Sequence, residues 1–222
     1  MVGVIMAGGE GVRCRPLTLT TPKPMLPVGG KPLLDTLVTQ LERAGCDPVY
    51  VVVRYLREQI EAYFGDRVQY LNEPEPWGTA GGLCLLPPQT EPFLVVNGDL
   101  LTPINFRDLW WFHRKGSYRL TLVRRFHAVT IPYGYPIVSK DRVLSFEEKP
   151  TFGYRVNSGI YCLNPGLLRD VKPPMDMPAL IRAAGTGGMV GAYLLEQPFH
   201  EIGTPESYAA AERFYEEHMR GE

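Results

Sequence analysis

Apolar and polar residues alternate along the first half of the chain in blocks that are typical of strands and helices in turn. Short apolar runs predict buried strands at Val2–Ala7, Val49–Val53, Val68–Leu71 and Phe93–Val96. Between them, apolar positions three and four residues apart predict helices at Leu33–Ala44, Leu56–Phe64 and Ala80–Leu86. Because repeated strand–helix–strand units form parallel sheets, we expect an α/β fold with a doubly wound, Rossmann-like sheet and ligands at the carboxyl ends of its strands.

The pattern changes after Tyr118, where β-rich segments separated by turns replace the regular alternation. Strands are predicted at Arg119–Arg124, Tyr135–Ser139, Val143–Phe146 and Val156–Leu163, and a C-terminal helix at Pro205–Arg220. No low-complexity linker or internal repeat divides the chain. We therefore expect a single domain, residues 1–222, whose halves (about 1–117 and about 118–222) share one mixed sheet.

The segment Gly8–Pro27, between the first strand and the first helix, reads GGEGVRCRPLTLTTPKPMLP. Its glycines let backbone amides approach an anion, and Arg13, Arg15 and Lys23 add mobile positive charge. It has neither the Gly-Lys-Ser/Thr ending of a P-loop nor the helix that follows the glycines of a dinucleotide fingerprint, because four prolines exclude that helix. We expect a long, stiffened loop that arches over a polyphosphate.

Composition narrows the class of protein without specifying its reaction. The chain has 222 residues, is 45% hydrophobic and carries a net charge of −1, which argues against nucleic acid as a partner. It has no apolar run of membrane-spanning length and no signal peptide, so we expect a cytoplasmic protein with no membrane partner. The four cysteines are scattered and suggest neither a zinc site nor a disulfide framework. His113 and His218, in charged helical surroundings, are predicted at the surface.

The loop and the residues after it resemble the signature of the sugar-1-phosphate nucleotidyltransferases, or NDP-sugar pyrophosphorylases, roughly GGxGTRLxPLTxxxPKPMLPVxxKP. The match continues through Val28–Pro32, and further motifs follow in the family's order as far as Tyr208. Val12 stands where the family usually has Thr, and Cys14 where it has Leu. In its sequence motifs the chain is similar to mannose-1-phosphate and heptose-1-phosphate guanylyltransferases. The resemblance implies the nucleotide-diphospho-sugar transferase fold, with a nucleotide-binding first half and a sugar-phosphate-binding second half.

The resemblance also implies roles for individual residues. Arg13 and Lys23 would be catalytic, and Asp99 and Glu201 would ligate Mg²⁺. Glu201 replaces the usual Asp in a motif that here reads FHEIGTPE, and its extra methylene group shifts the carboxylate that Mg²⁺ would meet. The nucleotide would be bound by residues Ala7, Gly8, Gly9, Gly11, Glu73, Gly78 and Thr79.

The sugar-phosphate end is indicated by the family's EKP, Asn-x-Gly and YGV elements, which here read EEKP, VNSGIY and PYGY. The resemblance implies that Lys149 contacts the sugar phosphate, that Glu148 and Asn157 bind sugar hydroxyls, and that Gly134 lets the backbone approach the sugar. An ammonium group offsets phosphate charge, while carboxylate and amide groups can bridge neighbouring hydroxyls.

The nucleotide base is a further question, raised by the segment NEPEPWGTAGGL. A carboxylate only accepts hydrogen bonds, and guanine offers two adjacent donors, whereas uracil and thymine offer one flanked by carbonyls. If Glu73 or Glu75 faces the base, GTP fits best. The other interpretation, that both glutamates flank prolines in solvent, stays open. UTP, dTTP and CTP also stay open as the nucleotide substrate.

These expectations describe an Mg²⁺-dependent enzyme of the EC 2.7.7 class that joins an NTP and a sugar 1-phosphate, releasing pyrophosphate. Two alternatives remain. Val12 and Glu201 keep open a catalytically weak regulatory subunit that binds nucleotide sugars. A phosphoamino-alcohol such as phosphocholine could also replace the sugar phosphate, although the EKP and Asn-x-Gly elements argue for a sugar. We expect a monomer or a homodimer.

Overall fold

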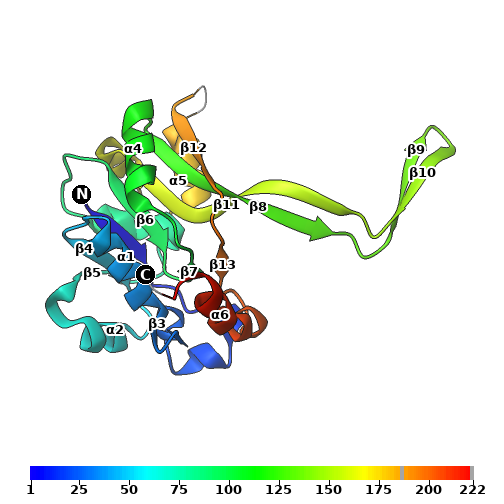
Figure 1. Ribbon diagram of the computed structural model, residues 1–222. Coiled ribbons are helices and arrows are strands. Elements are labelled where there is room, and N and C mark those ends of the chain that lie inside the picture. Colours follow the sequence, from blue (N-terminus) through cyan, green and yellow to red (C-terminus); the bar gives the residue numbers. More distant parts are fainter. Residues whose placement is uncertain (186–187, 221–222) are drawn as a thin grey trace.

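Seven strands form the central sheet of the computed structural model, in the order β12-β8-β11-β6-β1-β4-β5 (Figure 1). The structure describes residues 1–185 and 188–220. The strands of this sheet are β1 (Gly3–Met6), β4 (Val49–Val53), β5 (Gln69–Asn72), β6 (Phe93–Asn97), β8 (Leu120–Thr130), β11 (Thr151–Leu163) and β12 (Val190–Leu195).

The sheet is mixed, and both halves of the chain contribute to it. β1 lies between β4 and β6 and is parallel to both, and β5 extends the parallel part beyond β4. β11 is antiparallel to β6 and β8, and β12 is parallel to β8. The predicted Rossmann-like α/β fold with a mixed sheet is therefore confirmed, and the carboxyl ends of β1, β4 and β6 meet at one edge.

Helices cover both faces of the sheet, because sheet residues alternate in direction and both faces are apolar. On one face, α1 (Leu33–Arg43), α2 (Arg57–Phe64) and α4 (Phe106–Gly116) pack against a cluster that includes Ile5 and Val51. On the other face, α5 (Met177–Ala184) and the 3₁₀ turns Gly82–Leu85 and Pro165–Asp170 pack against a cluster that includes Val52 and Phe93.

Most predicted elements agree with the structure within a few residues, and the helix predicted before β6 does not. The helix predicted at Ala80–Leu86 is instead the short α3 (Gly78–Gly81) followed by a 3₁₀ turn. Glycine is required in this turn, since a Cβ on Gly82 would lie 2.5 Å from the Val52 side chain. The elements α5 and β12 were not predicted, and neither was α4 as a complete helix.

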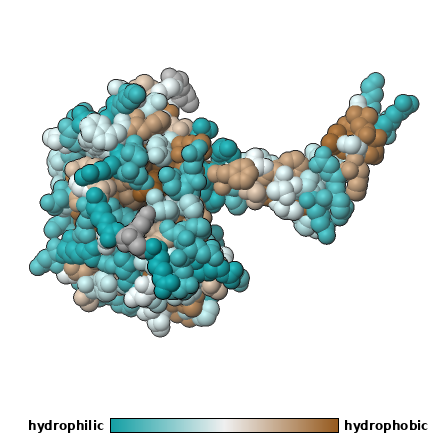
Figure 2. Space-filling view, in the orientation of Figure 1, coloured by the Kyte–Doolittle hydropathy of each residue, from teal (hydrophilic) through white to brown (hydrophobic). Residues whose placement is uncertain are grey.

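A long β-arm leaves the body of the protein, as Figure 1 shows. β8 and β11 remain paired beyond the sheet as far as Thr130 and Thr151. The arm ends in a hairpin formed by β9 (Gly134–Ser139) and β10 (Arg142–Glu148). In Figure 2 hydrophobic residues gather toward the outer end of this arm. The predicted strands Arg119–Arg124 and Val156–Leu163 are thus parts of longer strands.

The C-terminal helix α6 (Pro205–His218) packs beside the glycine-rich loop through a small core that includes Cys14, Leu26 and Ala211. Its start is fixed by a capping box between Thr204 and Ser207. Two short ladders join the same region, β13 (His200–Glu201) with β7 (Leu100–Leu101) and β2 (Pro27–Val28) with β3 (Lys31–Pro32). Among the described residues, no helix has the length and apolarity needed to cross a membrane.

Replacement of Phe93 tests the packing of the sheet. Phe93 is fully buried between β6 and the helices, so Phe93→Ala should lower the free energy of unfolding by about 3–5 kcal/mol. Tyr63 is 49% exposed on α2, and Tyr63→Ala should change it by less than about 0.5 kcal/mol. Urea unfolding followed by circular dichroism measures both values, and equal losses would contradict the assigned core.

Candidate active site

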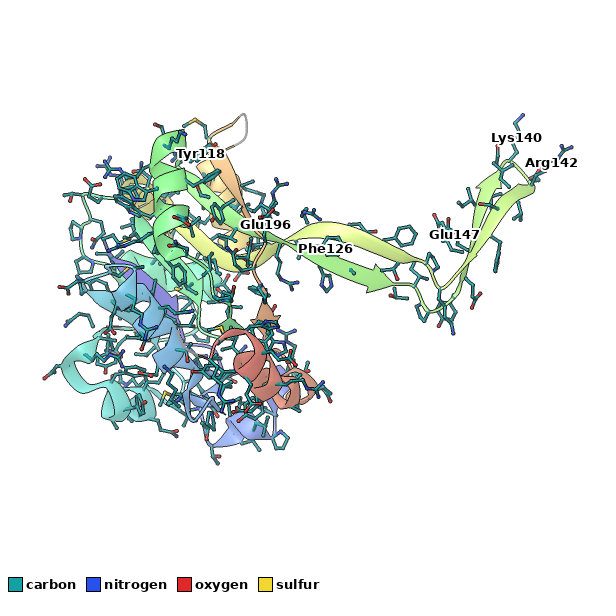
Figure 3. The ribbon with its side chains drawn as sticks, in the orientation of Figure 1. Tyr118, Phe126, Lys140, Arg142, Glu147 and Glu196 are labelled. Carbon is teal, nitrogen blue, oxygen red and sulfur yellow. The ribbon has the colours of Figure 1, made fainter. Side chains whose placement is uncertain are left out.

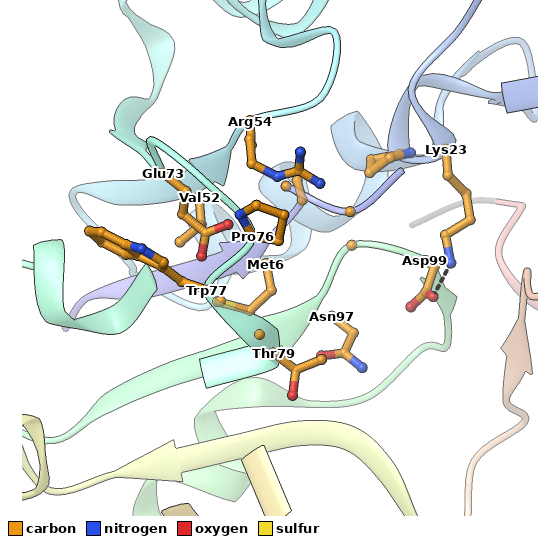
Figure 4. A pocket seen from close by; sticks show the side chains of 16 residues that line it. Met6, Lys23, Val52, Arg54, Glu73, Pro76, Trp77, Thr79, Asn97 and Asp99 are labelled. Carbon is orange, nitrogen blue, oxygen red and sulfur yellow. Dashed lines mark hydrogen bonds and ion pairs between the residues drawn. The ribbon is translucent and has the colours of Figure 1, made fainter. Parts of the chain in front are cut away.

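A pocket of about 310 Å³ opens at the edge where the carboxyl ends of β1, β4 and β6 meet (Figure 4). Eight of the residues predicted to form the site line it: Ala7, Gly8, Gly9, Lys23, Glu73, Gly78, Thr79 and Asp99. They come from separate segments that the sheet brings together. Its remaining walls are formed by residues Met6, Pro24, Val52, Arg54, Pro76, Trp77, Asn97 and Gly98.

The glycine-rich loop begins where β1 ends and is held in place by its neighbours. The Ala7 amide donates to the Val52 carbonyl at 2.9 Å, so backbone pairing continues past the strand. The Thr18 hydroxyl donates to the carbonyl of Gly11, whose φ of 61° is in the left-handed region. The loop then forms three 3₁₀ turns, Val12–Cys14, Leu17–Leu19 and Lys23–Met25, and no α-helix, as its prolines predicted.

One glycine of this loop faces open space. A Cβ on Gly9 would meet no atom within 4 Å, although Gly9 lines the pocket. Protein packing therefore does not require glycine at this position. A backbone without a side chain there leaves its amide accessible to an anion.

Lys23 and Asp99 form the central ion pair of the pocket. The Lys23 Nζ lies 2.5 Å from Asp99 Oδ2, and Figure 4 shows the two side chains directed toward each other. Both side chains are only 16% exposed. The other carboxylate oxygen of Asp99, Oδ1, is buried and has no hydrogen-bond partner among the described residues. Asp99 therefore offers one unoccupied acceptor inside the pocket.

Glu201 and Arg13 lie beside the pocket rather than in its lining. The ladder of β13 and β7 places Glu201 opposite Leu100, and the Ile202 amide donates to the Asp99 carbonyl at 2.9 Å. Glu201 is exposed. The Arg13 guanidinium lies 3.7 Å from the position of a Cβ on Gly203. The chain segments of both predicted metal ligands are thus adjacent, and Arg13 lies next to them.

Glu73 is the buried carboxylate of the pocket. It is 8% exposed, and its Oε1 atom has no hydrogen-bond partner among the described residues. Burial raises the pKa of the Glu73 carboxyl, while the Arg54 charge and the Gly82 backbone amide act to lower it. A Cβ on Gly8 would lie 2.9 Å from Glu73 Oε2, so this carboxylate borders the glycine-rich loop. Of the two glutamates considered from the sequence, Glu73 is buried and Glu75 is exposed.

The Pro76–Gly81 turn is fixed by a segment of the second half of the chain. The Met175 amide donates to the Trp77 carbonyl at 2.8 Å, and the Ala80 amide donates to the Met175 carbonyl at 2.9 Å. The Thr79 hydroxyl accepts from the Met177 amide at 2.8 Å. Gly78 has φ of 81°, and a Cβ there would lie 2.6 Å from the Met175 carbonyl oxygen, so only glycine fits.

The residues predicted for the sugar phosphate are not all brought to this pocket. Asn157, on β11, lies two residues from Gly159, whose Cβ position is 2.5 Å from the pocket residue Asn97. Gly134 and Glu148 pair with each other in the hairpin of the arm, and Lys149 follows directly. Figure 3 shows the neighbouring Glu147 well away from the body. The structure therefore separates these three residues from the pocket of their own chain.

Sequence reasoning missed Arg54, which lines the pocket and lies 3.6 Å from Glu10. The available signal was its position as the first charged residue after the apolar strand β4. Asn97, at the end of β6, was also missed as a site residue. Both follow the rule that polar side chains at the carboxyl ends of parallel strands face the ligand edge.

Glu73 gives a testable pH dependence of stability. Because burial raises the folded-state pKa of this acid, its ionisation costs stability as pH rises above the ordinary value of 4.5. Glu73→Gln should therefore raise the Tm of the unliganded protein at neutral pH and have little effect below that value. Glu75→Gln, at an exposed position, should have little effect at either pH. Differential scanning calorimetry of wild type and both variants at the two pH values measures these changes in Tm. A lower Tm for Glu73→Gln than for wild type at neutral pH would contradict the assignment.

Comparison with known proteins agrees with this arrangement. The family model "Nucleotidyl transferase" matches residues 2–218. The chain is 33% identical over 233 residues to a mannose-1-phosphate guanyltransferase of Yarrowia lipolytica, covering 97% of this chain and 64% of the relative. It is also 33% identical to the mannose-1-phosphate guanylyltransferase catalytic subunit beta of Drosophila pseudoobscura pseudoobscura, covering 98% of this chain and 63% of that protein. The chain thus spans less than two thirds of these relatives' length.

Solved structures show the same fold. A putative glucose-1-phosphate thymidylyltransferase from Bacillus anthracis superposes with a TM-score of 0.79 at 18% identity, covering 100% of this chain and 98% of that one. HddC from Yersinia pseudotuberculosis superposes with a TM-score of 0.73 at 25% identity, covering 96% and 99%. The family model spans almost the entire chain, and the signature loop lines the pocket. The chain belongs to the nucleotidyl transferase family.

Proposed function

We propose that this chain transfers a guanylyl group from GTP to a sugar 1-phosphate, with mannose 1-phosphate as the first candidate, giving a GDP-sugar and pyrophosphate. The observation that carries the proposal is the position of Glu73, a buried carboxylate that lines the pocket. Its Oε2 atom borders Gly8 of the glycine-rich loop, and its Oε1 atom, beside Gly82, has no hydrogen-bond partner among the described residues. The sugar and the base are also suggested by the names of the relatives, which are mannose-1-phosphate guanylyltransferases.

The base argument rests on hydrogen-bond complementarity. An ionised carboxylate has acceptors only, and guanine presents N1–H and its 2-amino group side by side. Glu73 lines the pocket and can accept from both donors, and its Oε2 atom borders the glycine-rich loop. Uracil or thymine would direct a carbonyl oxygen at the same carboxylate, which is repulsive. Trp77 lines the same part of the pocket and offers an apolar surface for the base.

The proposed reaction is an in-line displacement. An oxygen of the sugar phosphate attacks the α-phosphorus of GTP, the bond between that phosphorus and the bridging oxygen breaks, and pyrophosphate leaves with the electron pair. The amides of Gly8 and Gly9 hold the phosphates, and Lys23 neutralises the charge that develops during transfer. Arg13, at the edge of the loop, adds a second cation. No covalent intermediate on the enzyme is needed.

The residues present fit a bound Mg²⁺. Asp99 has a buried, unpaired carboxylate oxygen in the pocket, and the Glu201 segment lies beside it. No group of three or more His, Cys, Asp or Glu side chains gathers as a metal site within the described chain. This agrees with a cation that is held by one or two carboxylates and by substrate phosphates. Asp99 and Glu201 would hold Mg²⁺, which would supply charge neutralisation on the phosphates.

Lys23 provides the first test of the proposed chemistry. Lys23→Met removes the pocket ammonium, and kcat for pyrophosphate release with GTP and mannose 1-phosphate should fall by about 100-fold or more. Lys31 is the matched control, since its ammonium pairs with Asp35 at 3.3 Å and does not line the pocket. Lys31→Met should retain near-wild-type kcat. Near-wild-type turnover by Lys23→Met would contradict the mechanism.

Base selection is tested at Glu73. Glu73→Gln exchanges one acceptor for a donor, so kcat/KM for GTP should fall by about 10-fold or more, while the value for UTP should rise relative to GTP. Glu75→Gln should leave the GTP preference unchanged. Pyrophosphate release measured with GTP, ATP, UTP, dTTP and CTP gives the ratios. If wild type prefers UTP, or if both variants keep the same preference, Glu73 does not read the base.

A further inference from the structure

The arm is unusual because it carries large apolar side chains and no core of its own. No residue from Phe126 to Lys149 is buried. Tyr133 is 73% exposed, Leu144 67%, and Val143 and Phe146 63% each. A two-stranded ribbon is at best marginally stable in water, and exposed apolar patches of this kind mark interaction surfaces. Figure 2 shows hydrophobic residues gathered near the far end of the arm.

The backbone of the arm holds its hairpin away from the pocket of the same chain. β8 and β11 keep a continuous register from Arg125–Val156 to Thr130–Thr151. The Ile131 amide then donates to the Pro150 carbonyl, which closes the ribbon next to the hairpin. Six residues of strand at about 3.3 Å each make a ribbon of about 20 Å. The paired ribbon therefore holds the base of the hairpin away from the body of its own chain.

The pocket is meanwhile incomplete for its second substrate. A sugar 1-phosphate brings an additional anion, which needs a cation of its own. Lys23 and Arg54 are the cationic side chains that line the pocket within the described chain. Each is already near a carboxylate, Lys23 at 2.5 Å from Asp99 and Arg54 at 3.6 Å from Glu10. Lys149, the residue predicted to bind the sugar phosphate, is on the arm.

We propose that the exposed apolar side chains of the arm pack against a second copy of this chain. Two copies exchange arms around a two-fold axis, and each hairpin packs against the body of the partner copy, where Lys149 and Glu148 complete the sugar-phosphate end of that copy's pocket. This inference rests on the proposed function, because a sugar 1-phosphate is the substrate that Lys149 would bind. The segment 126–154 contains 29 residues, which matches the roughly 20–30 residues per side of a stable interface. A two-fold exchange also covers both arms and closes the assembly.

Complementation between two inactive variants tests this exchange. Lys23→Ala disables the pocket of its own chain, and Lys149→Ala disables the arm. In a mixed dimer, the pocket of the Lys149→Ala chain receives the intact arm of the Lys23→Ala chain, so one of its two sites is complete. The mixed dimer, purified through two different affinity tags, should recover about half of wild-type activity at limiting sugar 1-phosphate. If each arm served its own chain, every site would keep one defect and activity would not recover.

A second measurement decides the exchange without any activity. Cys84 is the exposed cysteine among the four, and the others are buried. In a Cys84→Ser background, Lys149→Cys is labelled with a thiol-specific benzophenone, and ¹⁴N and ¹⁵N chains are co-refolded and irradiated. Cross-links from this position to residues 6–24 should include cross-links that join a ¹⁴N chain to a ¹⁵N chain. Cross-links within one chain, or none to this segment, would overturn the proposal. Absent activity in wild type with active-site cross-links between chains would instead count against the proposed function alone.

The oligomeric state of surface variants gives a third test, with a control variant at an equally exposed position outside the arm. The double variant Val143→Lys, Leu144→Lys places charge on the arm and should shift a dimer toward monomer by light scattering. Trp111, on α4, is 62% exposed, which is close to the value for Val143. Trp111→Lys should remain dimeric. A wild-type protein that is monomeric at micromolar concentrations, or a double variant that stays fully dimeric, would refute the arm exchange.

Discussion

The parallel pairing of β1 with β4 and β6 determines where every other part of the site can lie. The pairing does not stop at the strand ends, because the Ala7 amide bonds to Val52 and the Gly98 amide bonds to the Met6 carbonyl at 2.9 Å. These two bonds carry the regular geometry of the sheet into the glycine-rich loop and into the loop of Asp99. A ligand edge built on three adjacent strands is rigid, and the side chains that reach it need little adjustment of their own.

Charge within the pocket is balanced internally in the free protein. Lys23 pairs with Asp99, and Arg54 lies near Glu10, so the region carries little net charge before ligands arrive. In the proposed reaction, a triphosphate with its cation would offer both members of the central pair new partners of opposite charge. Binding would then be an exchange of ion pairs rather than the creation of new ones, which limits the desolvation cost of bringing several charges into a partly buried space.

Much of the site could be predicted because its residues follow strands. Lys23, Glu73 and Asp99 lie in loops after β1, β5 and β6, and the sequence pattern was sufficient to expect those loops at one edge. The arm could not be predicted in this way. Leu144 and Phe146, on either side of Ser145, have the alternating apolar pattern of a covered strand, and a sequence does not say whether the cover comes from the same chain.

His113 shows a second limit of sequence reasoning. Its charged neighbours favoured a surface position, but it is buried, with its Nδ1 atom 2.9 Å from the Thr121 hydroxyl. Burial lowers its pKa to about 4. It lies four residues after Leu109 and so shares that residue's buried helix face. Spacing from the core residue Leu109 was therefore a better guide to the position of His113 than the charge of its neighbours.

The segment around Met175 connects the two halves of the molecule at the end of the pocket lined by Trp77. Its amide and carbonyl both bond to the Pro76–Gly81 turn, so neither segment can move without the other. The pocket wall formed by residues 76–79 is therefore shaped by residues about 100 positions away in the chain, which do not line the pocket themselves. Substitutions in Pro173–Met177 could move this turn and so change the shape of the pocket. Relatives of this fold could then change their choice of nucleotide while every pocket residue stays the same.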